Sequence, residues 1–331
     1  MFREIGNFLT GAESNPVQEE KGTRWKGGGL MSVDKRVVSW LELQKLRTQA
    51  LWGIFGGIAL LIPGAAVFIT GRMVPGVLLL LTALGALIWG FTRSSRYTKS
   101  YKDVIVRTAL ERTFDDLVFD PEAGFSRAML AETRMIAMGN RYHSDDFVSG
   151  SYQGVPFQRA DVLIQQVTST GKTTTVVTLF KGPWMIFDFG KPFRCDLQVT
   201  ERGFGSNRKH TGLFGLGATM TEIKTESAAF NERFRVFTES EHEAFYLLTP
   251  ALMERIRTLA AHVDGKLMLC FIDGRLHVAV YSNKNEFEPS LFRAPDRRDT
   301  ERVQASIGLI TTFVSTLKLT ENIMLWKGSV E

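Results

Sequence analysis

Three short sequences partly match the motifs of catalytic or nucleotide-binding sites, and each lacks a residue at an essential position. Gly171-Lys172-Thr173 matches the end of a phosphate-binding loop, but the earlier glycine of that loop is replaced by Gln166. His242-Glu243 starts like a zinc-protease helix, but Tyr246 stands where the second histidine is required. The glycine-rich tract 203–217 does not complete the G-x-G-x-x-G spacing of a dinucleotide site. The first motif therefore lacks the backbone N–H donors that bind a phosphate, and the second lacks one of the residues that bind zinc.

The acidic residues and histidines do not form a site by their spacing. Asp115-Asp116 and Asp145-Asp146 are adjacent pairs. Because neighbouring side chains on a strand point to opposite faces, we expect neither pair to work as one site. The five histidines are scattered, and His277 alternates with apolar residues, which is typical of a core or edge position on a strand. We predict no metal site and no cofactor, and we assign no catalytic residue.

The elements that would position any site begin with two apolar stretches. Ala50–Gly71 and Met73–Thr92 contain no charged residue, and only Arg72 separates them. Each stretch has about 20 residues, enough for a helix to cross a hydrocarbon core of roughly 30 Å. We predict a transmembrane helical hairpin over 48–92. The first span carries Gly53-x-x-x-Gly57, a spacing that lets helices approach closely; its partner is the second span or, in a homo-oligomer, another copy, and we favour the second span.

Basic residues flank the predicted hairpin on one side. Those before it are Lys35, Arg36, Lys45 and Arg47, and those after it are Arg93, Arg96, Lys99, Lys102 and Arg107. The positive-inside rule therefore predicts a multi-pass membrane protein with both termini in the cytoplasm. The candidate contacts to the membrane surface are Arg93, Arg96, Lys99 and Lys102. The spans lack Asp, Glu, Lys and His, which disfavours a transporter, and they supply few polar residues for a pore.

The remaining 93–331 are predicted to form one cytoplasmic α+β domain, mainly an antiparallel sheet with flanking helices, while 1–47 form a cytoplasmic tail and a lead-in helix. Strand patterns follow one another from Asp146 to Phe180, as in a meander. Thr249-Pro250 opens a helix as N-cap and first helical residue. A hairpin follows, with Asp273-Gly274 in its turn.

The positive charge of the chain is concentrated next to the membrane. The net charge is +5, yet the segment 93–112 alone carries six Lys or Arg and two Asp or Glu. A basic patch confined to the membrane flanks is suited to contact with anionic lipid and does not indicate nucleic-acid binding. The alternative, which we favour, is that these charges serve only to set the topology. We expect the partners to be the lipid bilayer and another membrane or membrane-proximal protein, and no nucleic acid. With only two cysteines, a reducing compartment is favoured.

Four sequence blocks, in their order, resemble a known family. They are Phe180–Phe193, Phe234–Arg257, Leu269–Tyr281 and Phe287–Phe292. Together they are similar to the bacterial membrane family catalogued as domain of unknown function 3137, over about 90–320. The resemblance implies paired spans followed by a cytoplasmic domain, and with it we predict a protein of the bacterial inner (cytoplasmic) membrane. It implies no activity, cofactor or catalytic residue.

We therefore predict a membrane-anchored cytoplasmic interaction or regulatory domain that is not evidently catalytic. The alternative is a membrane-bound enzyme whose site is assembled from scattered polar residues. The candidates for such a site are Lys181, Asp188, Lys191 and Glu243. A pocket that gathers these residues would favour the enzyme.

Overall fold

The computed structural model describes residues 29–188, 193, 195–204 and 220–317. The chain divides into two units, 1–41 and 42–331. The fold below is that of the second unit, together with the helix that enters it. Most of the glycine-rich tract 203–217 lies outside the described residues, and so does Lys191.

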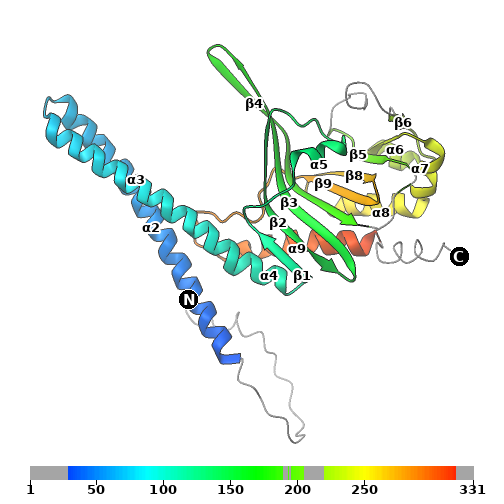
Figure 1. The fold of residues 1–331 in the computed structure, drawn as a ribbon, viewed down its shortest axis with the longest axis horizontal. Helices are drawn as coiled ribbons and strands as arrows, with labels where there is room; N and C mark the ends of the chain where they lie inside the picture. The colour runs from blue at the N-terminus through cyan, green and yellow to red at the C-terminus, as the bar shows by residue number, and fades with distance from the viewer. Residues whose placement is uncertain (1–28, 189–192, 194, 205–219, 318–331) are drawn as a thin grey trace, which may run out of the picture. The chain divides into compact units, whose positions relative to one another are not determined.

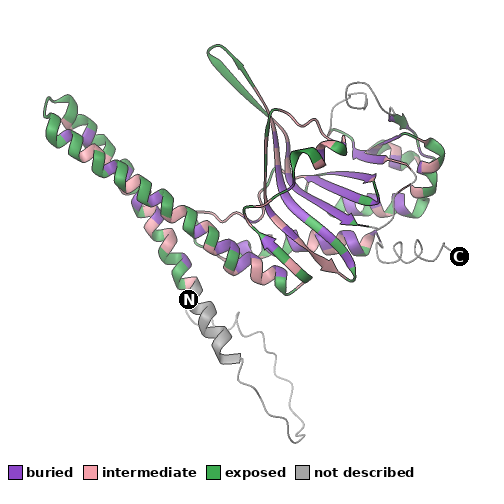
Figure 2. Ribbon diagram, viewed as in Figure 1, coloured by how far each residue is buried: buried purple, intermediate pink, exposed green. Residues whose placement is uncertain are grey.

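Two long apolar helices open the described chain. Helix α2 spans Gly29–Ile69 and α3 spans Met73–Tyr101, and both are long and apolar enough to cross a membrane. Only 17% of the most apolar window of each helix is buried, so most of these apolar side chains face outward (Figure 2). These two candidate spans give weak support to membrane association.

The two helices pack along rows of buried residues that are spaced seven positions apart and are mostly small. The rows are Leu43, Ala50, Gly57 and Gly64 on α2 and Gly76, Ala83, Gly90 and Tyr97 on α3, and Gly53 and Tyr101 are also buried. A Cβ atom added to Gly53 would lie 2.5 Å from the Cα of Gly90, and one added to Gly57 would lie 2.6 Å from Cγ of Leu87. The Gly53-x-x-x-Gly57 face is thus filled by the second helix of the same chain, the packing that the sequence favoured.

Helix α3 continues without a break toward the sheet. A π-helical turn, η1 (Lys102–Val106), follows it directly, and α4 (Arg107–Glu111) completes the rod. A π-helical turn accommodates an extra residue and is frequent at functional sites.

Within the described residues, nine strands form one antiparallel sheet in the order β1-β2-β3-β4-β9-β8-β5-β7-β6 (Figure 1). They are β1 (Asp115–Asp120), β2 (Arg141–Tyr152), β3 (Val155–Thr170), β4 (Thr173–Asp188), β5 (Leu197–Glu201), β6 (Thr221–Ile223), β7 (Phe234–Thr238), β8 (Lys266–Ile272) and β9 (Arg275–Tyr281). The meander and the Asp273-Gly274 hairpin are confirmed, and both turn residues have positive φ. The predicted α+β class is confirmed.

Helices cover the sheet and complete its core. They are α5 (Arg127–Glu132), α6 (Ala228–Arg233), α7 (Glu241–Leu247), α8 (Pro250–His262) and α9 (Arg297–Thr316). Around α5, Phe125 and Leu130 pack against Trp184 and Cys270 of the strands. On α9, which passes behind the strands in Figure 1, Val303, Ile307, Ile310 and Val314 form a buried apolar stripe. Thr249 caps α8 as expected, because its hydroxyl accepts from the Leu252 N–H at 3.2 Å.

The β3–β4 hairpin extends beyond the rest of the sheet. β2 pairs with β3 as far as Gln165, and β9 pairs with β4 only from Trp184 onward. All residues from Thr168 to Val177 are exposed, and this ribbon projects from the domain (Figure 2). It contains Gly171-Lys172-Thr173, which therefore forms a hairpin turn and not a phosphate loop.

Candidate functional site

A buried ion network lies where the helical rod meets the first strands. Its members are Lys102, Asp145, Asp146, Arg159, Asp161, Glu286 and Glu288. At its centre, Lys102 Nζ donates to Asp146 Oδ2 at 2.9 Å and lies 2.7 Å from Glu288 Oε1. Lys102 is 4% exposed and Asp146 is fully buried. The network thus joins the end of the candidate membrane helix to β2 and to the loop after β9.

A second cation lies on the neighbouring strand β3. Arg159 Nη2 donates to Asp161 Oδ1 at 2.8 Å and lies 3.5 Å from Glu286 Oε2. The guanidinium carbon is 4.0 Å from the centre of the Phe287 ring, a cation–π contact. Arg159 is 1% exposed, so this pairing is shielded from solvent. The β9–α9 loop, residues 282–296, therefore supplies one carboxylate to each of the two cations and the Phe287 ring to Arg159.

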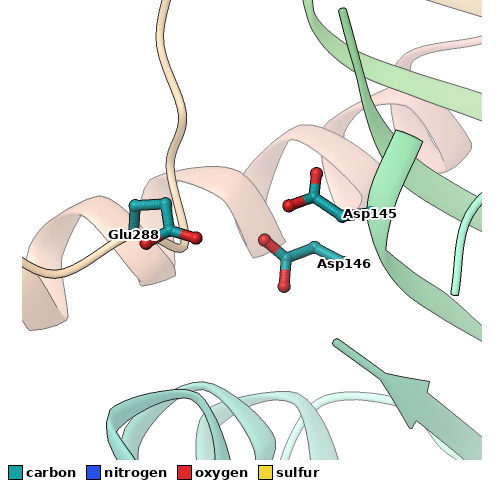
Figure 3. Close-up of side chains that lie close together, drawn as sticks. All are labelled: Asp145, Asp146 and Glu288. Atoms are coloured by element: carbon teal, nitrogen blue, oxygen red, sulfur yellow. The ribbon is translucent and has the colours of Figure 1, made fainter. Parts of the chain in front are cut away.

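The side chains of Asp145 and Asp146 lie together, which corrects the expectation that neighbours on a strand must point apart (Figure 3). The register between β2 and β3 shifts between Asp145 and Val148, and Asp146 has φ +56°. A bulge of this kind breaks the two-residue alternation of side chains. The alternation rule is valid for a regular strand, and it fails here because the strand is irregular at these two residues.

Three carboxylates of the network have a spacing that could hold a metal ion. One oxygen each of Asp145, Asp146 and Glu288 lies within 4.8 Å of the others (Figure 3). Oxygen ligands suit Ca²⁺ and Mg²⁺. However, the Lys102 ammonium already contacts two of the three carboxylates, so a divalent ion would have to compete with it. The arrangement is best described as an ion-pair network centred on lysine.

The network contains more carboxylates than cations. Four carboxylates contact Lys102 or Arg159, and Asp145 lies beside Asp146 and Glu288. Burial raises the pKa of Asp146 to about 6, although the nearby Lys102 opposes the shift. Burial also raises the pKa of Asp161 to about 7, against the effect of Arg159 and with that of Asp146 and Glu286. Both carboxyl groups therefore take up protons near neutral pH.

The β9–α9 loop also contacts the base of the two long helices. Arg47 Nε donates to the Leu291 carbonyl at 2.9 Å, and Arg47 Nη2 donates to the Phe292 carbonyl at 3.2 Å. The Tyr97 hydroxyl donates to the Ser290 carbonyl at 3.5 Å. The loop is therefore fixed to the helical pair at one end and to the ion network at the other.

The site residues predicted from the sequence lie elsewhere. Lys181 and Asp188 are both on β4, and a separation of seven residues along a strand is about 23 Å. Glu243 lies at the start of α7, and Lys191 is outside the described residues. The structure does not gather Lys181, Asp188 and Glu243 at one place. They remain an untested prediction for catalysis.

The predicted membrane-surface residues differ in their surroundings. Lys102 is buried in the ion network, so it is not free to contact lipid, contrary to expectation. Lys99 is exposed and pairs with Glu122 at 2.5 Å. Arg93 lies over the Trp89 ring at 5.6 Å. Arg93, Arg96 and Lys99 stay predictions as membrane contacts.

His277 is a core residue, as its strand position indicated. It is 3% exposed, and the Trp184 Nε1–H donates to its Nδ1 at 3.3 Å. Burial lowers the pKa of His277 to about 4, with a smaller effect from Arg275. The ring is therefore neutral at physiological pH and acts as a hydrogen-bond acceptor inside the core.

The fold and the network together define an α+β protein in which a pair of candidate membrane helices is joined to an antiparallel sheet by buried charges. Residues 178–319 match the family model described as "Protein of unknown function (DUF3137)". The resemblance stated from the sequence is confirmed over these residues, which make up less than half of the chain.

One solved structure is also similar. It is the mycobacterial trehalose monomycolate transport factor A, TtfA, with a TM-score of 0.36 and 8% identity, covering 67% of this chain and 94% of that chain. A TM-score of this size is too low to equate the two folds. No curated protein matches the chain.

Proposed function

We propose that the protein is a membrane-anchored interaction or regulatory domain of a bacterial inner membrane, with both termini in the cytoplasm. The observation that carries this proposal is the rod α3–η1–α4. It leads without a break from an apolar segment into a buried ion network, where Lys102 binds two carboxylates at 2.7 and 2.9 Å. A displacement of the helical pair would therefore move charged groups inside the domain, which is the connection that a regulatory protein needs.

The proposed topology is supported by the distribution of basic residues. Lys45 and Arg47 precede the apolar stretches and Arg93 and Arg96 follow them, while Arg72 is alone in the connection. A C-terminal alkaline phosphatase fusion tests this orientation. It should be inactive, because the enzyme folds only outside the cytoplasm, and an active fusion would refute the proposed topology.

The β3–β4 ribbon is the element that we propose for binding a protein partner. Its residues from Thr168 to Val177 are exposed, and Lys172 is the one charged residue among them. The two strands pair with each other and leave outward-facing backbone groups on their far sides. Exposed strand edges of this kind bind partners by adding a strand.

Site-specific crosslinking in intact membranes tests the interaction. A photoreactive amino acid replaces Thr175 on the ribbon in the full chain, and the same residue replaces the exposed Glu254 on α8 as a matched control. We expect a discrete crosslinked product from position 175 that the control does not give. Identical patterns from both positions would contradict a binding role for the ribbon.

The second candidate function is a membrane-bound enzyme with a site assembled from scattered polar residues. Its predicted residues Lys181, Asp188 and Glu243 are spread over β4 and α7. A crosslinked partner that depends on the ribbon would support the interaction domain. A catalysed reaction that is lost in a Glu243→Gln variant would support the enzyme.

A further inference from the structure

The tip of the β9–α9 loop exposes an aromatic ring beside the candidate membrane helices. Phe292 is 75% exposed, although it lies in a loop that is otherwise held firmly in place. Its ring centre is 6.4 Å from that of Phe55, an edge-on contact. Phe55 is itself 55% exposed and belongs to the uncharged stretch that begins at Ala50. The ring of Phe292 is therefore continuous with the apolar outer surface of α2.

Other aromatic side chains mark the same level of the helical pair. Trp52 on α2 is 74% exposed and Trp89 on α3 is 43% exposed. A Cβ atom added to Gly53 would lie 2.9 Å from Trp89, so Trp52 and Trp89 lie at one height along the pair. Tryptophan rings with a basic neighbour, here Arg93 over Trp89, are typical of the interface between lipid and water.

The backbone carbonyls of the loop tip have protein hydrogen-bond donors, as they would need in an environment that is poor in water. Three successive carbonyls, those of Ser290, Leu291 and Phe292, each accept a hydrogen bond from Arg47 or Tyr97. In water such carbonyls need no protein donor. Near the hydrocarbon an unpaired carbonyl is costly, and irregular backbone occurs there only where the protein satisfies it.

We propose that the β9–α9 loop inserts Leu291 and Phe292 into the interfacial region of the bilayer, in the leaflet that receives Trp52 and Trp89. This inference rests on the proposed function, because it requires that α2 and α3 span the membrane. The domain would then have a third contact with the membrane, made by the loop that also supplies Glu286 and Glu288 to the ion network. The β9–α9 loop would thus contact both the lipid and the buried ion network.

Spin labelling of the full chain in nanodiscs of phosphatidylcholine and phosphatidylglycerol tests the inference. In a Cys195→Ser background, with Cys270 left buried, single cysteines replace Phe292, Ile62 and Tyr246 in separate variants. Ile62 is 73% exposed on the apolar part of α2, and Tyr246 is 67% exposed on α7. Collision with dissolved oxygen reports lipid, and collision with a water-soluble nickel chelate reports the aqueous phase.

We expect the labels at 292 and 62 to collide with oxygen several-fold more than with nickel, and the label at 246 to show the reverse. If position 292 behaves like 246 while 62 is lipid-exposed, the loop does not insert and the proposed membrane anchor stands. If 62 also collides mainly with nickel, the membrane anchor itself is wrong and the loop inference falls with it.

A second substitution avoids the label. In Phe292→Trp, the fluorescence gained over the parent protein should be quenched by lipids that are brominated near the headgroup end of the acyl chain. A matched Tyr246→Trp variant should gain fluorescence that these lipids leave unchanged. Equal quenching of the two gains would overturn the proposed insertion.

Discussion

Replacing Lys102 by methionine is the most direct test of the ion network. The side chain is 4% exposed, and its ammonium contacts Asp146 at 2.9 Å and Glu288 at 2.7 Å. Methionine keeps the length and the apolar stem but removes the charge. Asp146 would then be left in a fully buried position, where its Oδ1 already has no hydrogen-bond partner among the described residues.

The expected loss of stability follows from this burial. Removing one partner of a buried ion pair costs about 3–5 kcal/mol, because the other charge stays buried and uncompensated. For a domain of this size, each kcal/mol lowers Tm by about 2–4 °C, so Lys102→Met should lower Tm by about 6–20 °C. The deficit should shrink as the pH falls, since a protonated carboxyl needs no cation. Burial already raises the pKa of Asp146 to about 6 in the presence of Lys102, and loss of the lysine, which lowers this pKa, would raise it further.

The assay is thermal unfolding of the full chain in detergent micelles, followed by tryptophan fluorescence. The matched control is Lys99→Met, three residues earlier at the end of α3, where the lysine is 65% exposed and pairs with Glu122. An exposed pair of this kind contributes at most about 1 kcal/mol. The double variant Lys102→Met with Asp146→Asn should recover much of the loss, because asparagine accepts the left-handed backbone at that position.

Equal and small Tm shifts for the Lys102 and Lys99 variants would refute the reasoning. They would mean that Lys102 is solvated in the folded protein. A large shift that the double variant does not relieve would point to lost packing at position 102, and not to the unpaired charge of Asp146.

Three further predictions concern other parts of the protein. Burial raises the pKa of Asp161 from 3.8 to about 7, so the folded state holds a proton that the unfolded state releases. The free energy of unfolding should therefore fall as the pH rises from about 4 to about 7. Asp161→Asn removes the titrating group and should flatten a plot of Tm against pH over this range. Gly57→Leu should separate the helices and cost about 1–3 kcal/mol in micelles, while its neighbour Gly56→Leu, whose added Cβ meets nothing within 4 Å, should be tolerated. Thr249→Ala should cost about 0.5–2 kcal/mol in thermal unfolding, through loss of the α8 cap.

Features encoded by neighbouring residues could be predicted from the sequence. The Asp273-Gly274 turn and the Thr249 cap depend on residues only a few positions apart, and both were confirmed. The uncharged stretch that begins at Ala50 and its glycine spacing likewise predicted the helical pair and its close packing.

The ion network could not be predicted in this way. Lys102 meets Asp146 and Glu288 at large sequence separations, and as a basic residue after an apolar stretch it matched the pattern of a membrane flank. The pairing of Asp145 with Asp146 depends on a bulge, which strand periodicity alone does not reveal. The block Phe287–Phe292 was noted for its family resemblance, and it was the one sequence feature that pointed to this part of the network. The resemblance did not indicate that the block contacts buried charges.

The π-helical turn Lys102–Val106 fixes the number of residues between the membrane side and the sheet side of the rod. The row of buried residues spaced seven apart on α3 runs to Tyr97, which contacts the β9–α9 loop, and the buried Leu110 follows the π-helical turn. Deleting one residue from this turn would rotate the residues before it against those after it by about 100°. The packing of α3 on α2 and the packing of α4 on the domain would then require different orientations of one continuous helix. Changes in length should therefore be tolerated far less between Tyr97 and Leu110 than at the exposed Gly71–Arg72 connection.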